Sequence, residues 1–158
     1  MEYNMPSNEE LAKMQSQFSM KYKRLHPDAK APEKAHPNDL GWDLFSIDEY
    51  EIPPFNRMVI STGIAIQFPT NTGAFIRDRS GIARDQGVFV QAGTVDPNYT
   101  GEIQILLFNS NASPVIIKKG TKIAQFVLMP VFIISSLEEV GELEQTDRSD
   151  QGFGSSGQ

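Results

Sequence analysis

Five short polar clusters in this chain of 158 residues carry side chains suited to binding an anion and activating water. The first cluster considered is the C-terminal tail at 148–157, where one arginine and one aromatic ring stand among glycines and serines. Such a tail cannot bury a core, but it can close over a ligand, with Arg148 offered to an anionic group and Phe153 to a flat one. The alternative interpretation is an ordinary disordered C-terminus.

A second cluster, at 77–83, places an arginine, a small hydroxyl and a glycine where a strand passes into a helix. Ser80, Gly81 and the amides that follow can form an anion-binding nest at the helix N-terminus, beside Arg79. The alternative is a serine that caps the helix, flanked by solvated arginines.

A third cluster, at 41–46, contains an aspartate inside an apolar strand. Asp43 lies between Trp42 and Leu44 and points away from both, so it faces either water or a polar site. Taken alone, a solvent-facing aspartate is the commoner outcome.

The fourth cluster, at 92–102, is built around Asp96-Pro97-Asn98, a tight-turn signature that predicts a hairpin between strands at 88–95 and 101–109. At the mouth of this hairpin Asp96 can serve as a general base, provided that it is packed partly out of water. The alternative is an Asx-turn residue that caps the bend. Tyr99 is either a core residue or the flat wall of a pocket.

The fifth cluster, at 120–126, places Gln125 inside an apolar strand. An unpaired amide there would be costly, so the side chain needs a hydrogen-bond partner. Lys122, on its spacing, is expected at the surface.

Short strands must position these clusters. Alternation over 57–68 places Ile64, Ile66 and Phe68 on one face. The pattern predicts further strands at 18–25, 42–47, 49–53, 73–78, 88–95, 101–109, 113–118 and 122–133. Many short strands separated by Gly, Pro and Asn turns indicate an all-β sandwich or barrel.

Two helical pieces interrupt the strands. Ser7-Asn-Glu-Glu10 is a capping box that predicts a short peripheral helix to about Gln17. The segment 80–86 predicts one or two helical turns, and 134–147 a strand end that runs into a linker.

Composition limits the classes of function. The length suits one domain, and the absence of cysteine and of a signal-like N-terminus fits a cytoplasmic setting. No apolar run reaches transmembrane length, so no membrane partner is expected. The net charge of −6 disfavours nucleic acid, which needs a broad basic face, and favours a small anion held by a few local groups.

Taken in order, the clusters resemble the five motifs of the trimeric dUTPase family (deoxyuridine 5′-triphosphate nucleotide hydrolases). The similar segments are 24–46, 79–83, 93–102, 120–125 and the tail from Arg148. The resemblance implies a jelly-roll-like β domain over 18–137, preceded by an N-terminal extension at 1–17 and followed by a linker and flexible arm at 138–158. It also implies a homotrimer with active sites at the subunit interfaces.

The implied reaction is hydrolysis of dUTP to dUMP and pyrophosphate with Mg²⁺, in the cytoplasm of the cell or of a phage or viral host. Such an enzyme limits uracil incorporation into DNA and supplies dUMP for dTMP synthesis. The sequence shows no dense carboxylate cluster, so we expect Mg²⁺ to arrive on the triphosphate, with Asp43 reaching it at most through water.

The resemblance also implies residue roles. Asp96 would be the general base for in-line attack on the α-phosphorus, with Gln125 holding the water, and Asp43 would act behind them on the arginine or a metal-bound water. Tyr99 would reject ribonucleotides by sterics, Arg148 would reach the γ-phosphate and Phe153 would stack on uracil. The implied substrate-binding residues are Arg79, Ser80, Gly81, Gly93, Thr94, Val95, Tyr99, Arg148, Phe153, Gly154 and Ser155.

Two alternatives compete with this function. A dCTP deaminase shares the implied fold but needs a glutamate in the strand after the hairpin, where this chain has Leu106. A non-catalytic jelly-roll protein that binds nucleotide or regulates a partner would not need Asp96 and Gln125. The tail also departs from the family pattern, with Ser149, Asp150 and Gln151 at usually different positions, and Asp150 puts an anion near the expected γ-phosphate.

Overall fold

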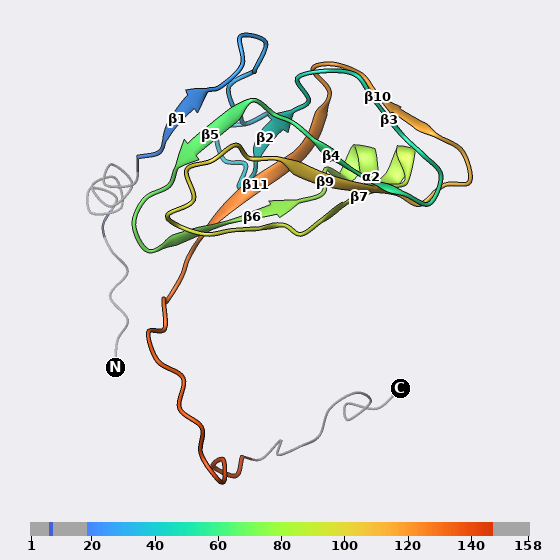
Figure 1. Ribbon diagram of the computed structural model, residues 1–158. Coiled ribbons are helices and arrows are strands. Elements are labelled where there is room, and N and C mark those ends of the chain that lie inside the picture. The colour runs from blue at the N-terminus through green and yellow to red at the C-terminus, as the bar shows by residue number, and fades with distance from the viewer. Residues whose placement is uncertain (1–6, 8–18, 147–158) are drawn as a thin grey trace.

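Eleven short strands and one helix make up the part of the chain that the computed structural model describes, residue 7 and residues 19–146 (Figure 1). The strands are β1 (Lys21–Arg24), β2 (Trp42–Phe45), β3 (Tyr50–Ile52), β4 (Arg57–Ile60), β5 (Ile64–Gln67), β6 (Thr72–Arg77), β7 (Val88–Gln91), β8 (Thr94–Val95), β9 (Ile105–Asn109), β10 (Val115–Ile117) and β11 (Lys122–Pro130); the helix is α2 (Ser80–Gln86). The helix expected at 7–17 and the tail from Arg148 lie outside the described residues.

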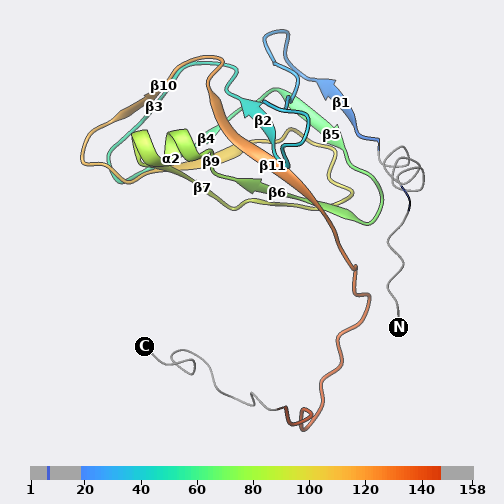
Figure 2. The ribbon, with the colours of Figure 1, turned by 180° about the vertical axis from the view of Figure 1, so that it is seen from behind.

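The strands form four antiparallel sheets, seen from two sides in Figures 1 and 2. The largest has the order β2-β11-β6-β8, and a second has the order β4-β9-β7. The pairs β1-β5 and β10-β3 complete the fold. This arrangement confirms the all-β, jelly-roll-like fold with one short internal helix.

The core lies between the sheets, where alternating strand positions meet. Ile64, Ile66 and Phe68 are all buried, as the alternation predicted. The segment 57–68 is nevertheless two strands, because Gly63 adopts a left-handed φ of 65° between β4 and β5. The prediction of one strand is therefore corrected there.

The predicted pairing of 88–95 with 101–109 is correct for residues 88–91 and wrong for residues 94–95. Strand β7 pairs with β9, but β8 leaves that sheet and pairs with β6. The chain turns at Ala92, whose φ of 53° is left-handed, and then at Gly93, where an added Cβ would lie 2.5 Å from the carbonyl oxygen of Ile76. Because residue 93 is a glycine, the backbone can approach β6 closely. The turn around Asp96 therefore lies at the β2-β11-β6-β8 sheet and not at the sheet that contains β7 and β9.

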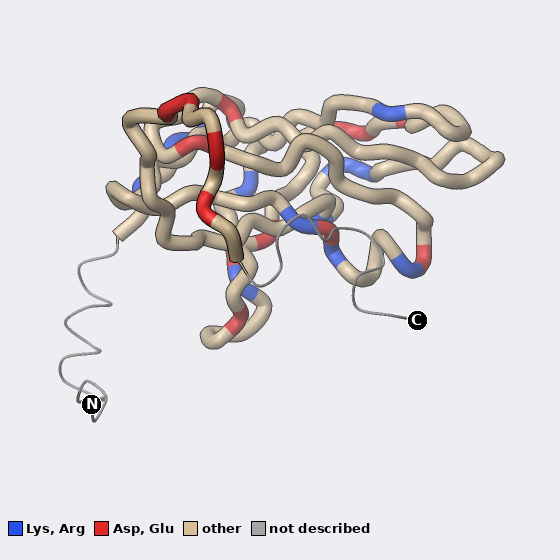
Figure 3. The backbone as a smooth tube through the Cα atoms, turned by 90° about the horizontal axis from the view of Figure 1, so that it is seen from below, with Lys and Arg blue, Asp and Glu red and all other residues tan. Residues whose placement is uncertain are grey.

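The helix α2 has the predicted bounds and ends at Gly87, whose left-handed φ of 59° is a common helix stop. Strand β11 ends at Pro130, earlier than expected, and residues 131–146 continue without helix or strand, away from the sheets in Figure 1. No helix in the described residues is long and apolar enough to cross a membrane. Basic and acidic residues are interspersed along the backbone in the view of Figure 3.

Candidate active site

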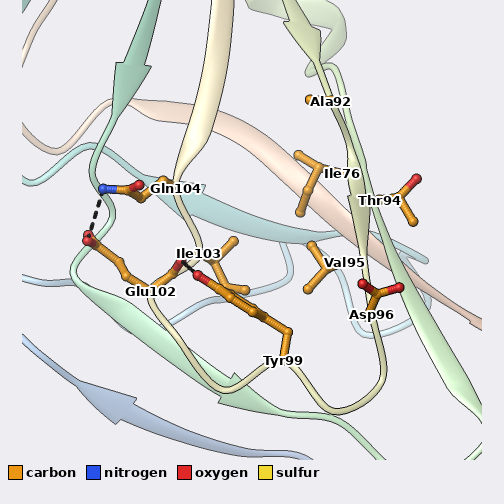
Figure 4. A pocket seen from close by; sticks show the side chains of 9 residues that line it. All are labelled: Ile76, Ala92, Thr94, Val95, Asp96, Tyr99, Glu102, Ile103 and Gln104. Atoms are coloured by element: carbon orange, nitrogen blue, oxygen red, sulfur yellow. Dashed lines mark hydrogen bonds between the residues drawn. The ribbon is translucent and has the colours of Figure 1, made fainter.

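A pocket of about 280 Å³ opens where the segment 92–99 faces residues 102–104 (Figure 4). Its lining comprises Ile76, Ala92, Thr94, Val95, Asp96, Tyr99, Glu102, Ile103 and Gln104. The ring of Tyr99 forms one wall near Ile103, facing Val95 across the hollow. Tyr99 is 45% exposed, so it is a pocket wall and not a core residue.

Glu102 holds the side of this pocket formed by residues 102–104. The sequence did not indicate this role. Its backbone oxygen accepts a hydrogen bond from the Tyr99 hydroxyl at 2.9 Å, and its Oε1 accepts one from the amide of Gly63 at 2.8 Å. A Cβ at Gly101 would lie 2.5 Å from that hydroxyl, so this glycine leaves room for the tyrosine. The orientation of the ring is therefore set by Glu102 and Gly101.

The carboxylate of Asp96 is exposed at the rim of the pocket. The turn closes through its backbone, with the Tyr99 amide donating to the Asp96 carbonyl at 3.1 Å. Within the described part of the chain no hydrogen bond engages its side chain, so the structure does not support the Asx-turn alternative. A single chain also does not pack this carboxylate out of water, and any desolvation has to come from substrate or from other segments.

Asp43 is buried, so of the two interpretations left open for it the solvent-facing one is wrong and the polar site is right. Its side chain is 3% exposed and contacts two cations, with Oδ1 against the guanidinium of Arg79 and Oδ2 at 2.9 Å from the ammonium of Lys122. The backbone of Glu33 lies across it, since the Asp43 amide donates to the Glu33 carbonyl at 2.7 Å. A polar site thus replaces water around this carboxylate, and Lys122 is a partly buried ion-pair partner where a simple surface position was expected.

Gln125 lies in the middle of the same sheet. It stands opposite Asp43 on one side and Arg77 on the other, and its amide donates to the carbonyl of Asp78 at 2.9 Å. The partner required by its position is therefore present. A Cβ at Gly41 would overlap the Gln125 side-chain oxygen, so this glycine opens the space that the amide occupies.

Ser80 and Gly81 are exposed in the first turn of α2. Arg79 is the N-cap residue, and no side-chain hydrogen bond caps the helix. The serine is therefore the first helical residue, and the interpretation that it caps the helix is wrong. An added Cβ at Gly81 would meet no atom within 4 Å, so there is open space beside this first turn.

These residues form two groups that a single chain holds apart. Val95 pairs with Ala74 of β6, and continuing this register places Asp96 beside Gly73. Gln125 pairs with Arg77, three residues beyond the partner of Val95 and on the other side of β6, and Arg79 lies past the end of that strand. The first group is thus the pocket with Thr94, Val95, Asp96 and Tyr99, and the second is Asp43, Arg79, Gln125, Ser80 and Gly81. The remaining predicted residues, Arg148, Phe153, Gly154 and Ser155, lie outside the described residues.

The part of the chain that the structure describes has no cluster of protein ligands for a metal ion. In residues 7 and 19–146 no three carboxylate or imidazole groups converge. Asp43 is occupied by two cations, and Asp96 offers one carboxylate. This arrangement fits a divalent metal whose ligands are mainly phosphate oxygens and water, as Mg²⁺ prefers.

Comparison with known proteins gives concordant matches. A family model described as dUTPase matches residues 27–157. The deoxyuridine 5′-triphosphate nucleotidohydrolase of Clostridium tetani is 44% identical over 144 residues, which cover 90% of this chain and 99% of that protein. The protein of the same name from Hydrogenobaculum sp. is 46% identical over 138 residues, covering 85% and 95%.

Solved structures agree. The dUTPase of Staphylococcus bacteriophage 80alpha, solved with dUpNHpp, superposes with a TM-score of 0.82 at 27% identity, covering 88% of this chain and 98% of that one. A mutant of the dUTPase from phage phi11 of S. aureus, described with a structural Mg(II) ion, has a TM-score of 0.73 at 24% identity over 80% of this chain and 99% of that one, a likeness of fold.

Proposed function

The chain belongs to the dUTPase family, and from this premise we propose that it is a dUTP diphosphatase that hydrolyses dUTP with Asp96 as its general base. The observation that carries the assignment of the base is the exposed carboxylate of Asp96, without a side-chain hydrogen bond in the described residues, at the rim of the pocket that Tyr99 walls. A carboxylate in that position can accept a proton from a water held in hydrogen-bond reach.

The proposed chemical step is an in-line displacement at the α-phosphorus. Asp96 takes a proton from water while the water oxygen bonds to phosphorus, the bridging bond between the α- and β-phosphates breaks, and pyrophosphate leaves with dUMP as the other product. The Gln125 side chain, with its amide directed at the Asp78 carbonyl, has an oxygen that can accept a hydrogen bond from this water. Ser80 would donate to the oxygen on which leaving-group charge develops.

The pocket would hold the nucleoside. The backbone of Gly93, Thr94 and Val95 would supply donors and acceptors for a uracil edge, and Tyr99 would exclude a ribose 2′-hydroxyl by steric clash. The volume of about 280 Å³ is of the size expected for a small ligand group. By removing dUTP, the enzyme would limit uracil in DNA and supply dUMP.

The triphosphate would be bound by separate groups. Arg79, held by Asp43, and the amides at Gly81 would face the phosphates, while Mg²⁺ carried by the substrate would neutralise part of their charge. From the tail, Arg148 would reach the γ-phosphate and Phe153 would cover uracil, with Gly154 and Ser155 beside it.

We propose a homotrimer whose active sites combine residues of different subunits. The placement of Asp96 near the start of β6 and of Arg79 past its end supports this, because a second copy would bring the two groups onto the same phosphate. Exposed apolar side chains beyond β11, among them Phe132, Ile134 and Leu137, offer a surface for association.

The test is pyrophosphate release from dUTP with Mg²⁺, comparing the wild type with Asp96→Asn. We expect release from dUTP but not from dCTP, dTTP or UTP, and a fall in kcat of about 10²- to 10⁴-fold in the variant with little change in KM. A folded wild type that binds dUTP without releasing pyrophosphate would contradict the proposal, and so would an unchanged kcat in Asp96→Asn.

A further inference from the structure

Four charged side chains of alternating sign run from the surface to the proposed phosphate-binding arginine. Glu33 Oε1 lies 2.9 Å from Lys122 Nζ, the same nitrogen lies 2.9 Å from Asp43 Oδ2, and Asp43 Oδ1 contacts Arg79 Nη1. The side-chain exposures are 56% for Glu33, 35% for Lys122, 3% for Asp43 and 29% for Arg79. The buried carboxylate is therefore the central link between two cations.

The fold holds Lys122 in this position. It stands opposite Phe45 in the β11–β2 ladder, immediately before an irregularity in register between Lys122 and Ala124. A β-bulge of this kind re-aims the side chain next to it. Its ammonium also lies 5.7 Å from the centre of the Phe45 ring, a cation–π distance.

The two oxygens of Asp43 are divided between the two cations. The Lys122 ammonium lies near Oδ2 without the alignment of a hydrogen bond, so the contact is an ion pair that opposes the carboxylate charge. If Lys122 were absent, Oδ2 would be buried without a cation, and the whole carboxylate charge would be committed to Arg79. A guanidinium neutralised in this way offers less to a phosphate.

We propose that Lys122 is a positioning residue for the hydrolysis of dUTP, which keeps Arg79 available to the triphosphate by sharing Asp43 with it. Glu33 modulates the same balance from the solvent side by drawing on the Lys122 ammonium. This inference rests on the proposed function, because it takes Arg79 to be a phosphate-binding group.

The test measures the Kd of the non-hydrolysable analogue dUpNHpp and of dUMP for Lys122→Met, Lys122→Gln and Lys122→Arg. We expect the methionine and glutamine variants to bind dUpNHpp about tenfold more weakly and dUMP within about twofold of the wild type. Lys122→Arg should stay within about threefold, because it retains the charge. Glu33→Gln should bind dUpNHpp about twofold more tightly than the wild type.

A double-mutant cycle with Arg79→Met separates this role from others. If Lys122 acts through Arg79, its loss has little further effect on dUpNHpp binding once Arg79 is absent. An equal loss in both backgrounds would mean that Lys122 binds phosphate directly, and an equal loss for dUMP and dUpNHpp would mean a structural role; either result overturns the proposal.

Lys119→Met is the matched control, because it breaks another lysine–carboxylate pair, with Asp28 at 2.6 Å on an exposed surface. It should leave both affinities unchanged. Melting temperatures confirm that each variant is folded. Wild-type turnover of dUTP is measured alongside. If the double-mutant cycle gives the expected binding result but dUTP is not hydrolysed, only the proposed activity is contradicted. A wild type that does not bind dUpNHpp would overturn both the proposed activity and the proposed role of Lys122.

Discussion

At the scale of single residues, Gly41 has a measurable part in positioning Gln125. Because a Cβ at Gly41 would overlap the Gln125 side-chain oxygen, Gly41→Ala must displace the amide from its hydrogen bond with the Asp78 carbonyl. We expect kcat to fall about 10- to 100-fold, since a displacement of about 1 Å in a positioning group has that effect. Steady-state kinetics with dUTP would measure it.

Gly141→Ala is the control for this substitution, because an added Cβ at Gly141 meets no atom within 4 Å. It should leave kcat unchanged. Retention of the wild-type rate in Gly41→Ala would show that Gln125 does not contribute to the chemical step.

The sequence suggested candidates for the chemistry-bearing residues more readily than it suggested their partners. Asp96, Tyr99 and Gln125 stand in short motifs whose residue types suggest a role, and the structure places the first two on one pocket. Glu102 and Lys122 act through contacts with residues distant in the sequence, at Gly63 and Asp43. Such contacts depend on sheet register, which strand alternation alone does not specify.

At the scale of elements, Asn109 ties the end of β9 to the β3 end and to the loop before β10. Its buried amide donates to the carbonyls of Ile52 at 3.0 Å, Pro53 at 3.2 Å and Ser113 at 2.8 Å. Asn109→Ala leaves these acceptors without their donor and removes buried side-chain contacts. We expect the free energy of unfolding to fall by about 2–4 kcal/mol, measured by urea denaturation.

The exposed Gln67, on β5, provides the comparison, and Gln67→Ala should change stability by less than about 0.5 kcal/mol. Similar midpoints for the two variants would show that the Asn109 amide does not hold these elements together.

Most strand positions and the bounds of α2 followed from alternation and turn residues. Two places where the strand prediction failed, Gly63 and Ala92, are residues with left-handed φ that end one strand and start another in a new direction. Alternation continues through such points in the sequence, so it cannot show that the chain has changed sheets. The register of β8 against β6, which separates the two groups of the site, was hidden for the same reason.

At the scale of the whole molecule, active sites at subunit interfaces would allow two inactive variants to restore each other's activity in mixed oligomers. Asp96→Asn and Arg79→Met each remove one group, and within one chain these groups lie near opposite ends of β6. If a site takes them from different subunits, random co-assembly of equal amounts restores both groups in about a quarter of the sites.

Pyrophosphate release from co-expressed chains, compared with each variant alone, measures this recovery. Mixtures no more active than the separate variants would place both residues of a site in the same chain.

The exposed apolar side chains of residues 132–143 also affect how the molecule reaches its final state. Phe132, Ile134, Leu137 and Leu143 are not covered by the described part of their own chain. In the proposed trimer their burial would accompany association, which would make chain concentration a variable of conformational stability and give refolding a bimolecular phase. The lifetime of the native protein would then depend on how much of it is synthesised, so that expression level and folding yield are linked.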